Sequence, residues 1–366
     1  MLSRDLLKQI LEATRDLWDR TETRPAVREN FARMLDCRTP ALGAEVYASA
    51  TEEKVFNHTC KSRACPSCGY RATLLWQRKQ WTVLPDIQYA GVGFTMPDVL
   101  WPIFKQNRHL LHDLPALAAE VIQQWVKARY GVRVLIMVVP HTFGAHLNFN
   151  CHLHILVSTG GLQESEGRWI SQLWFDKRAL MAMWRYAVIT FLREALEANV
   201  LESNLNREEL RRVFKTQYER WWNIYIDGLV SKRHFLGYAA RYVRRPPIAQ
   251  RRFVKVTHRE VEFLTKDKPE NRVVTTRYSI EEFIALWAEH VPDRYRHAIR
   301  YFGLLAPGTK GRTSAALFAL LGQEKRPRPR RLSWQNSLRK YFGVDPLVDS
   351  CGQPMHWVGR LRPVAA

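Results

Sequence analysis

Two apolar segments, residues 132–141 and 149–158, constrain the fold of this chain more than any other feature. They read VRVLIMVVPH and FNCHLHILVS, and the second ends before Gly160 and Gly161. Each has the length and composition of a buried strand, whereas a membrane span needs about 20 consecutive apolar residues. The N-terminus mixes both charge signs at helical spacing and lacks the apolar core of a signal peptide. We therefore expect a soluble, cytoplasmic protein built around a sheet.

Helical and strand patterns surround these two segments. Helices are predicted at 3–36, 70–81, 98–129, 176–198, 206–221, 231–244 and 280–290, and further strands at 89–96, 223–226, 252–257, 260–265 and 271–278. This order predicts an α+β fold, in which helices cover an antiparallel or mixed sheet. We divide the chain into residues 1–85, which are helical and contain a cysteine cluster, residues 86–260, which contain the two apolar strands, and a basic C-terminal region, residues 261–366.

The charge balance favours a nucleic-acid partner. The 366 residues include 56 Lys and Arg against 35 Asp and Glu, which gives a formal net charge of +21. A basic surface binds nucleic acid because each neutralised phosphate releases a counterion, although a merely basic soluble protein is the alternative. The basic residues cluster at Arg241, Arg244, Arg245, Arg251 and Arg252, and again at Lys325, Arg326, Arg328, Arg330 and Arg331. The chain has 13 Trp, 13 Tyr and 16 Phe, and we expect most of these rings in the core. Aromatic rings beside arginines can also stack on the bases of single-stranded nucleic acid.

The second apolar segment contains a pair of histidines, His152 and His154. Residues two apart on a strand share a face, so both imidazoles point to one side of the sheet. Two imidazoles on one face can bind a divalent metal ion, or they can be core histidines with hydrogen-bond partners. Burying two imidazoles without partners costs several kcal/mol, which favours the metal. Cys151 points to the opposite side, and we expect it in the core.

A pair of tyrosines, Tyr238 and Tyr242, follows in the segment FLGYAARYVRRPPIAQRR. Residues four apart on a helix lie on one face, so the two phenols project together beside the arginines. A tyrosine can act as a nucleophile and form a covalent intermediate. This spacing is also common for half-buried tyrosines of a helix, so the pair alone predicts little.

The cysteines indicate a metal site in a reducing compartment. The six cysteines are too few and too unevenly spaced for a disulfide framework in a chain of this length, and three of them, Cys60, Cys65 and Cys68, lie within nine residues. Structural zinc takes four tetrahedral ligands, so a fourth residue is required. Cys37 is the first choice for it and His58 the second. Reduced cysteines without a metal, in a degenerate module, are the alternative.

Four blocks of the sequence, taken in order, resemble the rolling-circle transposases of the IS91 type, which are two-tyrosine HUH endonucleases. HTFGAHLNFNCHLHILVSTGG (141–161) is similar to their metal-binding strand, and GYAARYVRRPPIAQRRF (237–253) to their nucleophile helix with its basic exit. RYFGLLAPGTKGR (300–312) resembles a downstream block. CRTPALG (37–43) and HTCKSRACPSC (58–68) resemble the N-terminal zinc module. The resemblance covers residues 37 to 312.

This resemblance implies an HUH nuclease domain over residues 86–260 and a metal-dependent enzyme that nicks and joins single-stranded DNA at hairpin-like ends of an insertion sequence. His152 and His154 would bind Mg²⁺ or Mn²⁺, together with a third ligand for which Asn, Gln, Glu and Asp remain open. Tyr238 and Tyr242 would form 5′-phosphotyrosine links. Zn²⁺, bound by Cys37, Cys60, Cys65 and Cys68, would have a structural role. The DNA would be contacted by Arg63 and Arg71 of the zinc module and by Arg241, Arg244, Arg245, Arg251 and Arg252.

The chain departs from the family pattern in two places. Where members of the family have another Cys-x-x-Cys pair, this chain reads SATEEKV (49–55). The segment DPLVDSCGQPM (345–355) resembles a further Cys-x-x-Cys element, but Val348 takes the first cysteine position and only Cys351 remains. This departure motivates a second hypothesis, a catalytically inactive DNA-binding descendant of a transposase. A third hypothesis is a nickase that initiates plasmid or phage replication, which would share the chemistry but act at an origin.

Overall fold

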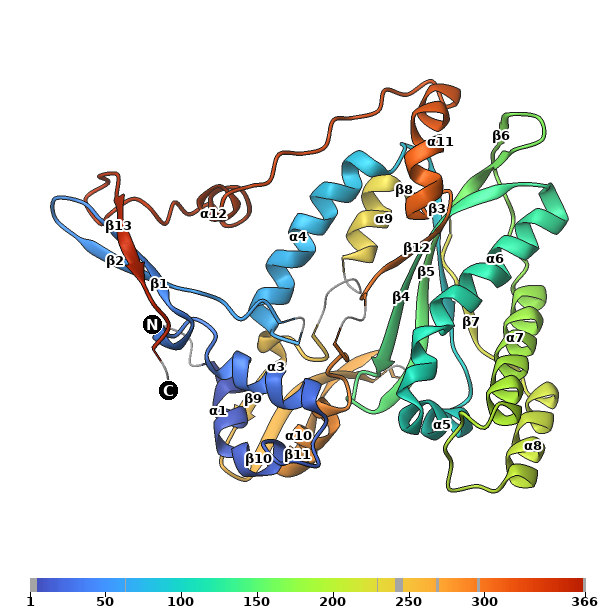
Figure 1. Cartoon of the computed structure of the whole chain (residues 1–366), viewed down its shortest axis with the longest axis horizontal. Coiled ribbons are helices and arrows are strands. Elements are labelled where there is room, and N and C mark those ends of the chain that lie inside the picture. Colours follow the sequence, from blue (N-terminus) through green and yellow to red (C-terminus); the bar gives the residue numbers. More distant parts are fainter. Residues whose placement is uncertain are drawn as a thin grey trace.

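The computed structural model of this protein describes residues 5–62, 64–228, 230–240, 246–267, 270–294 and 297–364. Its central unit is a sheet in which β12, β4, β5, β3 and β7 lie in that order, while β6 pairs with β5 and β8 with β3 (Figure 1). All of these pairs are antiparallel. The strands are β3 (Gln88–Phe94), β4 (Arg133–Phe143), β5 (Phe149–Gln163), β6 (Arg168–Ile170), β7 (Ile224–Ile226), β8 (Val230–Ser231) and β12 (Arg300–Gly303).

One face of the central sheet lies beneath a continuous layer of helices, and we call it the helical face. Alternate side chains of the strands, such as Phe94, Ile155 and Val138, are buried there against α6 (Leu114–Tyr130) and α7 (Lys177–Glu197). The Trp184 ring packs 5.0 Å from the Phe94 ring. α5 (Trp101–Gln106) and α8 (Arg207–Thr216) extend this layer (Figure 1). This is the largest core of the molecule described.

The opposite face is covered over part of its length by α4 (Pro66–Val83), α9 (Lys232–Ala239) and α11 (Pro307–Leu320) (Figure 1). The rings of Tyr89 on β3 and Phe235 on α9 stack at 4.3 Å. The buried Lys232 ammonium donates to the carbonyls of Trp81 and Leu84 at the end of α4, and pairs with the Asp86 carboxylate at 2.6 Å. A cation is favourable at a helix C-terminus, so these contacts anchor the first turn of α9.

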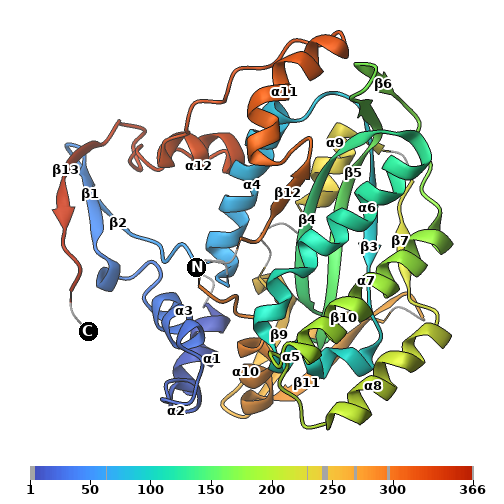
Figure 2. The same cartoon turned by 45° about the vertical axis from the view of Figure 1, so that its right-hand side comes forward.

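A second core lies beside the β4–β5 turn (Figure 2). It joins α1 (Leu6–Ala13), α2 (Arg15–Trp18), α3 (Pro25–Leu35) and α10 (Ile280–Ala288) with the antiparallel strands β9 (Phe253–Val256), β10 (Glu260–Asp267) and β11 (Arg272–Ser279). Leu147 of the turn is fully buried in this core despite a positive φ of 61°. The Arg252 guanidinium donates a hydrogen bond to the Ala145 carbonyl, and the Tyr278 hydroxyl donates one to the His146 carbonyl. The second core therefore holds the end of the β4–β5 hairpin.

A third sheet joins the two ends of the chain. β1 (Ala44–Ala48) pairs with β2 (Glu53–Asn57) and with β13 (His356–Leu361), and both pairs are antiparallel. The sheet stands away from the central unit, and α12 (Trp334–Phe342) lies between them (Figure 1). Short 3-10 helices occur at Pro40–Leu42, Asp98–Leu100, Arg108–His112, Gln217–Glu219 and Gln250–Arg252.

The α+β prediction and the antiparallel central sheet are confirmed. The predicted helix at 206–221 is too long: α8 ends at Thr216, because Trp222 turns into the core and the chain then enters β7. The helix predicted at 231–244 is seen as α9 to Ala239, and residues 241–245 lie outside the described residues. β12 brings residues 300–303 into the central sheet. Over the described parts of the chain, no helix combines the length and the hydropathy that a membrane crossing requires.

Candidate functional site

α4 and α9 cover only part of their face of the sheet. The rest of this face carries the candidate site, and we call it the open face. The pairing register arranges its residues in rows that run across the strands. One row holds Val139 of β4, His154 of β5, Gly93 of β3 and Tyr225 of β7. The next row outward pairs His141 with His152. Directly paired residues on antiparallel strands point to the same side, so all these side chains share the open face.

Three histidines converge in these rows. The ligand nitrogens of His141, His152 and His154 all lie within 4.8 Å of one another. The ring centroids are 5.5 Å apart for His141 and His152, 4.8 Å for His141 and His154, and 5.0 Å for His152 and His154. The His152 Nδ1–H donates to the Asn150 carbonyl at 2.8 Å, which places the Nε2 lone pair toward the cluster. Such a set of imidazoles can bind one divalent transition-metal ion.

His141 is the residue that the sequence analysis did not single out. The sequence left the third ligand open among Asn, Gln, Glu and Asp, whereas the structure places a third imidazole there. A histidine at the end of the neighbouring apolar segment was the available signal. This signal could not be used without knowing how β4 pairs with β5, because a shift of β4 by one residue would turn His141 to the helical face.

Tyr238 of α9 lies on the open face, one strand away from His154. A Cβ placed on Gly91 of β3 would be 3.3 Å from Cε1 of the Tyr238 ring and 3.1 Å from an Asp227 carboxylate oxygen. Gly91 is two residues from Gly93, which pairs directly with His154. Gly91 and His154 are therefore diagonal neighbours, which lie about 7–8 Å apart, so the Tyr238 ring over Gly91 shares a face of the sheet with the imidazoles. Tyr242 lies outside the described residues.

Four cysteines form a second cluster, at the edge of the second core. The sulfur atoms are 3.8 Å apart for Cys37 and Cys68, 3.6 Å for Cys60 and Cys68, and 4.0 Å for Cys37 and Cys65. Tetrahedral zinc with Zn–S bonds of about 2.3 Å separates its sulfur ligands by about 3.8 Å, so the cluster has the dimensions of a Cys₄ zinc site. The packing of the thiols lowers the pKa of Cys37 to about 7, chiefly through hydrogen bonding from Cys60.

His58, the second choice for the fourth ligand, is engaged elsewhere. Its Nδ1 lies 3.1 Å from the Leu42 carbonyl and its Nε2 3.2 Å from a Glu45 carboxylate oxygen. Cys151 is buried in the core of the helical face, as expected, and burial raises the pKa of its thiol to about 12. Cys351 is exposed.

The arginines predicted to bind DNA have different environments. Arg71 contacts the Ser337 hydroxyl from α4 at 3.4 Å, and Arg251 is exposed in a 3-10 helix. Arg252 uses its guanidinium to donate to the carbonyls of Leu264 and Ala145, so it holds the β4–β5 turn. Arg63, Arg241, Arg244 and Arg245 lie outside the described residues.

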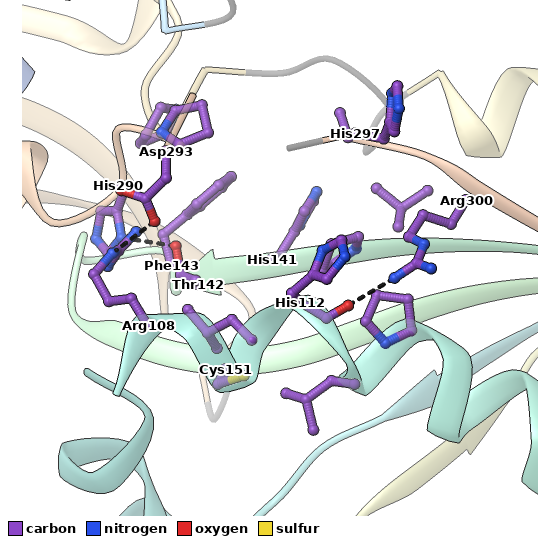
Figure 3. A pocket seen from close by; sticks show the side chains of 18 of the residues that line it. Arg108, His112, His141, Thr142, Phe143, Cys151, His290, Asp293, His297 and Arg300 are labelled. Atoms are coloured by element: carbon purple, nitrogen blue, oxygen red, sulfur yellow. Dashed lines mark hydrogen bonds and ion pairs between the residues drawn. The ribbon is translucent and has the colours of Figure 1, made fainter. Parts of the chain in front are cut away.

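A pocket of about 160 Å³ opens beside His141, where β12 leaves the edge of β4 (Figure 3). Arg108 and Asp293 lie at one end, joined at 3.3 Å, and Arg300 donates to the His112 carbonyl at the other. His290 is buried in its wall, with Nε2–H donating to the Leu147 carbonyl at 2.7 Å and Thr142 3.2 Å from Nδ1. The pocket therefore has a largely apolar lining, with an Arg–Asp ion pair at one end and an arginine at the other.

Comparisons with known proteins match both parts of this arrangement. Residues 136–313 match the family model described as "Putative transposase", and residues 8–96 match the one described as "Transposase zinc-binding domain". The chain is 31% identical over 329 residues to the transposase for insertion sequence element IS801 of Pseudomonas savastanoi pv. phaseolicola, which covers 87% of this chain and 80% of that protein.

A second relative is "Putative transposase y4qJ" of Sinorhizobium fredii (strain NBRC 101917 / NGR234). The identity to it is 28% over 302 residues, which covers 78% of this chain and 76% of the relative. No solved structure matches. The zinc-binding match covers all four residues of the cysteine cluster, and the other covers the three histidines and α9.

Proposed function

This chain belongs to the family of insertion-sequence transposases that includes the IS801 transposase, and we propose that it nicks and joins single-stranded DNA through 5′-phosphotyrosine intermediates. Family membership implies DNA binding with strand cleavage and transfer. The finer proposal is an HUH endonuclease that acts at hairpin-like ends of an insertion sequence during rolling-circle transposition. It is supported above all by one observation: the Tyr238 ring of α9 packs over Gly91 of β3, on the face of the sheet that carries the three histidines of β4 and β5.

In this proposal His141, His152 and His154 bind Mn²⁺ or Mg²⁺. Imidazole ligands favour Mn²⁺ over the harder Mg²⁺. When bound, the cation polarises the scissile phosphate and neutralises charge on the leaving oxygen. The protein holds the three imidazoles on two paired strands, β4 and β5, and the second core holds the turn between these strands.

The phenolic oxygen of Tyr238 or Tyr242 attacks the phosphorus after losing its proton to solvent. A bond forms between that oxygen and phosphorus, the bond between phosphorus and the 3′ oxygen breaks, and the 3′ oxygen takes up a proton from solvent. The protein is left attached to the 5′-phosphate, beside a free 3′-OH. The phosphotyrosine link keeps the phosphodiester energy, so attack by a new 3′-OH joins strands and releases the tyrosine without ATP.

The zinc module and the charge of the chain supply DNA contacts. We propose that Cys37, Cys60, Cys65 and Cys68 bind one structural Zn²⁺, and that Arg63 and Arg71 near them contact phosphates, together with Arg241, Arg244, Arg245, Arg251 and Arg252. The net charge of +21 makes this binding steeply salt-dependent. The protein acts in the cytoplasm, associated with the nucleoid when bound to DNA.

The proposal is tested with a labelled single strand from the element end, incubated with the protein and Mn²⁺ and resolved on a denaturing gel. Wild type should give a covalent adduct. The double variant Tyr238→Phe/Tyr242→Phe should give no adduct and keep DNA binding, and His141→Ala should lose metal-dependent adduct formation.

Tyr186→Phe and His297→Ala are matched controls, because Tyr186 lies on α7 over the helical face and His297 lines the pocket outside the histidine cluster. Peptide mapping of the single variants then identifies the tyrosine that attacks first. A wild-type protein that binds the strand without any adduct would support the inactive descendant, and an adduct that survives in the double variant would refute the tyrosine assignment.

A further inference from the structure

A tyrosine that the proposed chemistry does not use, Tyr225, lies in the same row as His154. It belongs to the short strand β7, and its side chain is 55% exposed. Its neighbours Ile224 and Ile226 point to the helical face, where Ile224 is fully buried. Within the described residues, its hydroxyl has no hydrogen bond. Burial and hydrogen bonding therefore do not account for an aromatic ring at this position.

The side chain of Tyr225 lies against Gly93. A Cβ placed on Gly93 would be 3.5 Å from both Cβ and Cδ2 of Tyr225, so the tyrosine covers the space that a side chain on β3 would fill. Gly93 pairs with Tyr225 on one side and with His154 on the other. With strands about 4.8 Å apart, the backbones of Tyr225 and His154 are about 10 Å apart across one glycine. Tyr225 is therefore one strand away from His154 in the same row, and the β3 residue between them is a glycine.

The neighbouring row supports the same arrangement. Over Gly91, the Tyr238 ring and the Asp227 carboxylate occupy the space that a side chain would fill. Tyr238 over Gly91 and Tyr225 beside Gly93 are thus neighbours along β3, on the face that carries the three histidines. A phosphate bound between the cation ligands and the nucleophile would place an adjoining nucleotide near Tyr225.

We propose that Tyr225 is a stacking platform for an unpaired base next to the phosphate that is cut, an inference that rests on the proposed function. An aromatic ring binds an unpaired base of any sequence, because every base has a flat π face. A ring that is half exposed beside the histidine cluster suits a single strand and not a duplex, whose bases are already stacked. Tyr225 thus helps to select single-stranded substrate and to position the scissile phosphate, while Tyr238 supplies the nucleophile.

The test uses single strands from the element end that carry 2-aminopurine at each position around the nick. Wild type should quench the fluorescence at one position strongly, and an abasic nucleotide at that position should weaken binding roughly tenfold to a hundredfold. Tyr225→Ala should lose the quenching and weaken binding to the intact strand by a similar factor. On the abasic strand, Tyr225→Ala should bind as wild type does, since the variant and the missing base remove the same contact.

Matched variants separate stacking from other roles. Tyr225→Phe and Tyr225→Trp should keep the quenching and the affinity, whereas Tyr186→Ala, on α7 over the helical face, should change neither. Loss of binding in Tyr225→Phe would assign the role to the hydroxyl and overturn the proposal. An equal loss for Tyr225→Ala on intact and abasic strands would also overturn it, because the contact would then not involve a base.

The fluorescence measurement reports binding and not cleavage, so its result is independent of the adduct assay. A position-specific quench that depends on the ring at 225, in a protein that forms no adduct, would refute the proposed nuclease and keep the stacking site. An adduct that forms normally, without any dependence of binding on the ring, would refute the stacking site alone.

Discussion

At the scale of single residues, four histidines near the open face and the pocket have two different environments. His141, His152 and His154 gather their nitrogens at the open face, where the site can receive a cation. His290, close by in the pocket wall, is instead buried with both nitrogens engaged, by the Leu147 carbonyl and the Thr142 hydroxyl. Both contacts suit the neutral tautomer with the proton on Nε2. Burial lowers the pKa of His290 to about 4, so this histidine packs as a neutral core residue.

The pKa of His290 predicts a dependence of stability on pH. An unfolded histidine has a pKa of about 6.5, so between pH 6.5 and pH 4 the unfolded chain binds a proton that the folded chain does not. The free energy of unfolding therefore falls as the pH falls through this window, by up to roughly 3 kcal/mol from this group. Urea unfolding at pH 7 and pH 4.5 should show a smaller decrease for His290→Gln than for wild type.

His258→Gln is the control for this measurement, because His258 is exposed in the turn between β9 and β10. It should keep the wild-type decrease. An unchanged decrease in His290→Gln would show that His290 does not contribute to the acid sensitivity.

At the scale of elements, the segments that depart from the family pattern at 49–55 and 345–355 meet in space. The Asp349 carboxylate accepts hydrogen bonds from the hydroxyls of Ser49 at 2.6 Å and Thr51 at 2.8 Å, and from the amides of Cys351 and Gln353. These bonds lower the pKa of Asp349 to about 2. A hydrogen-bonded carboxylate thus joins the β1–β2 turn to the loop before β13.

Removal of this carboxylate should release β13 from β1. In Asp349→Ala, hydrogen exchange of residues 356–361 and of the β1–β2 turn should be faster by roughly tenfold or more, because several bonds to a charged group are lost. Exchange in β4 and β5 should not change. The wild-type protein should show the same loosening as the pH falls from about 4 toward 2, since the folded pKa lies below the unfolded value of about 3.9.

Ser350→Ala provides the comparison, because Ser350 is the exposed neighbour of Asp349 and contacts Glu52 through its backbone amide. It should exchange like wild type. Wild-type exchange rates in Asp349→Ala would show that β-sheet pairing alone holds β13.

At the scale of the whole molecule, the cysteine cluster connects parts that are distant in the sequence. Cys37 follows α3, Cys60 lies in the loop after β2, and Cys65 and Cys68 begin α4. Three of the four are buried with the apolar side chains of the second core, which also holds Leu147 of the β4–β5 turn. A metal ion in this cluster would therefore stabilise the core that supports the strands carrying His141, His152 and His154.

Zinc removal should loosen the segments around the cysteine cluster before the rest of the molecule. We expect one zinc per chain, and chelation should speed hydrogen exchange across residues 37–70 and the first turn of α4, because a structural metal contributes directly to folding. Cys37→Ser should lose the zinc, whereas Cys351→Ser, at an exposed site outside the cluster, should retain it. Stoichiometric zinc in Cys37→Ser, or unchanged exchange after chelation, would contradict the assignment.

Features that depend on local geometry could be predicted from the sequence alone. His152 and His154 share a face because strand side chains alternate, and Cys60, Cys65 and Cys68 can meet because few residues separate them. The α+β class and most strands followed from apolar periodicity in the same way. The division of the chain at residues 85 and 260 remains a prediction.

Only the tertiary structure decided which distant residues complete these sites. His141 joins the pair through the register of β4 against β5, and Tyr225 enters the row of His154 through the pairing of β7 and β5 with β3. The pairing of β13 with β1 likewise joins segments about 300 residues apart along the chain. Such contacts depend on how strands align and how cores pack across the whole chain, and a local sequence pattern carries no record of that alignment.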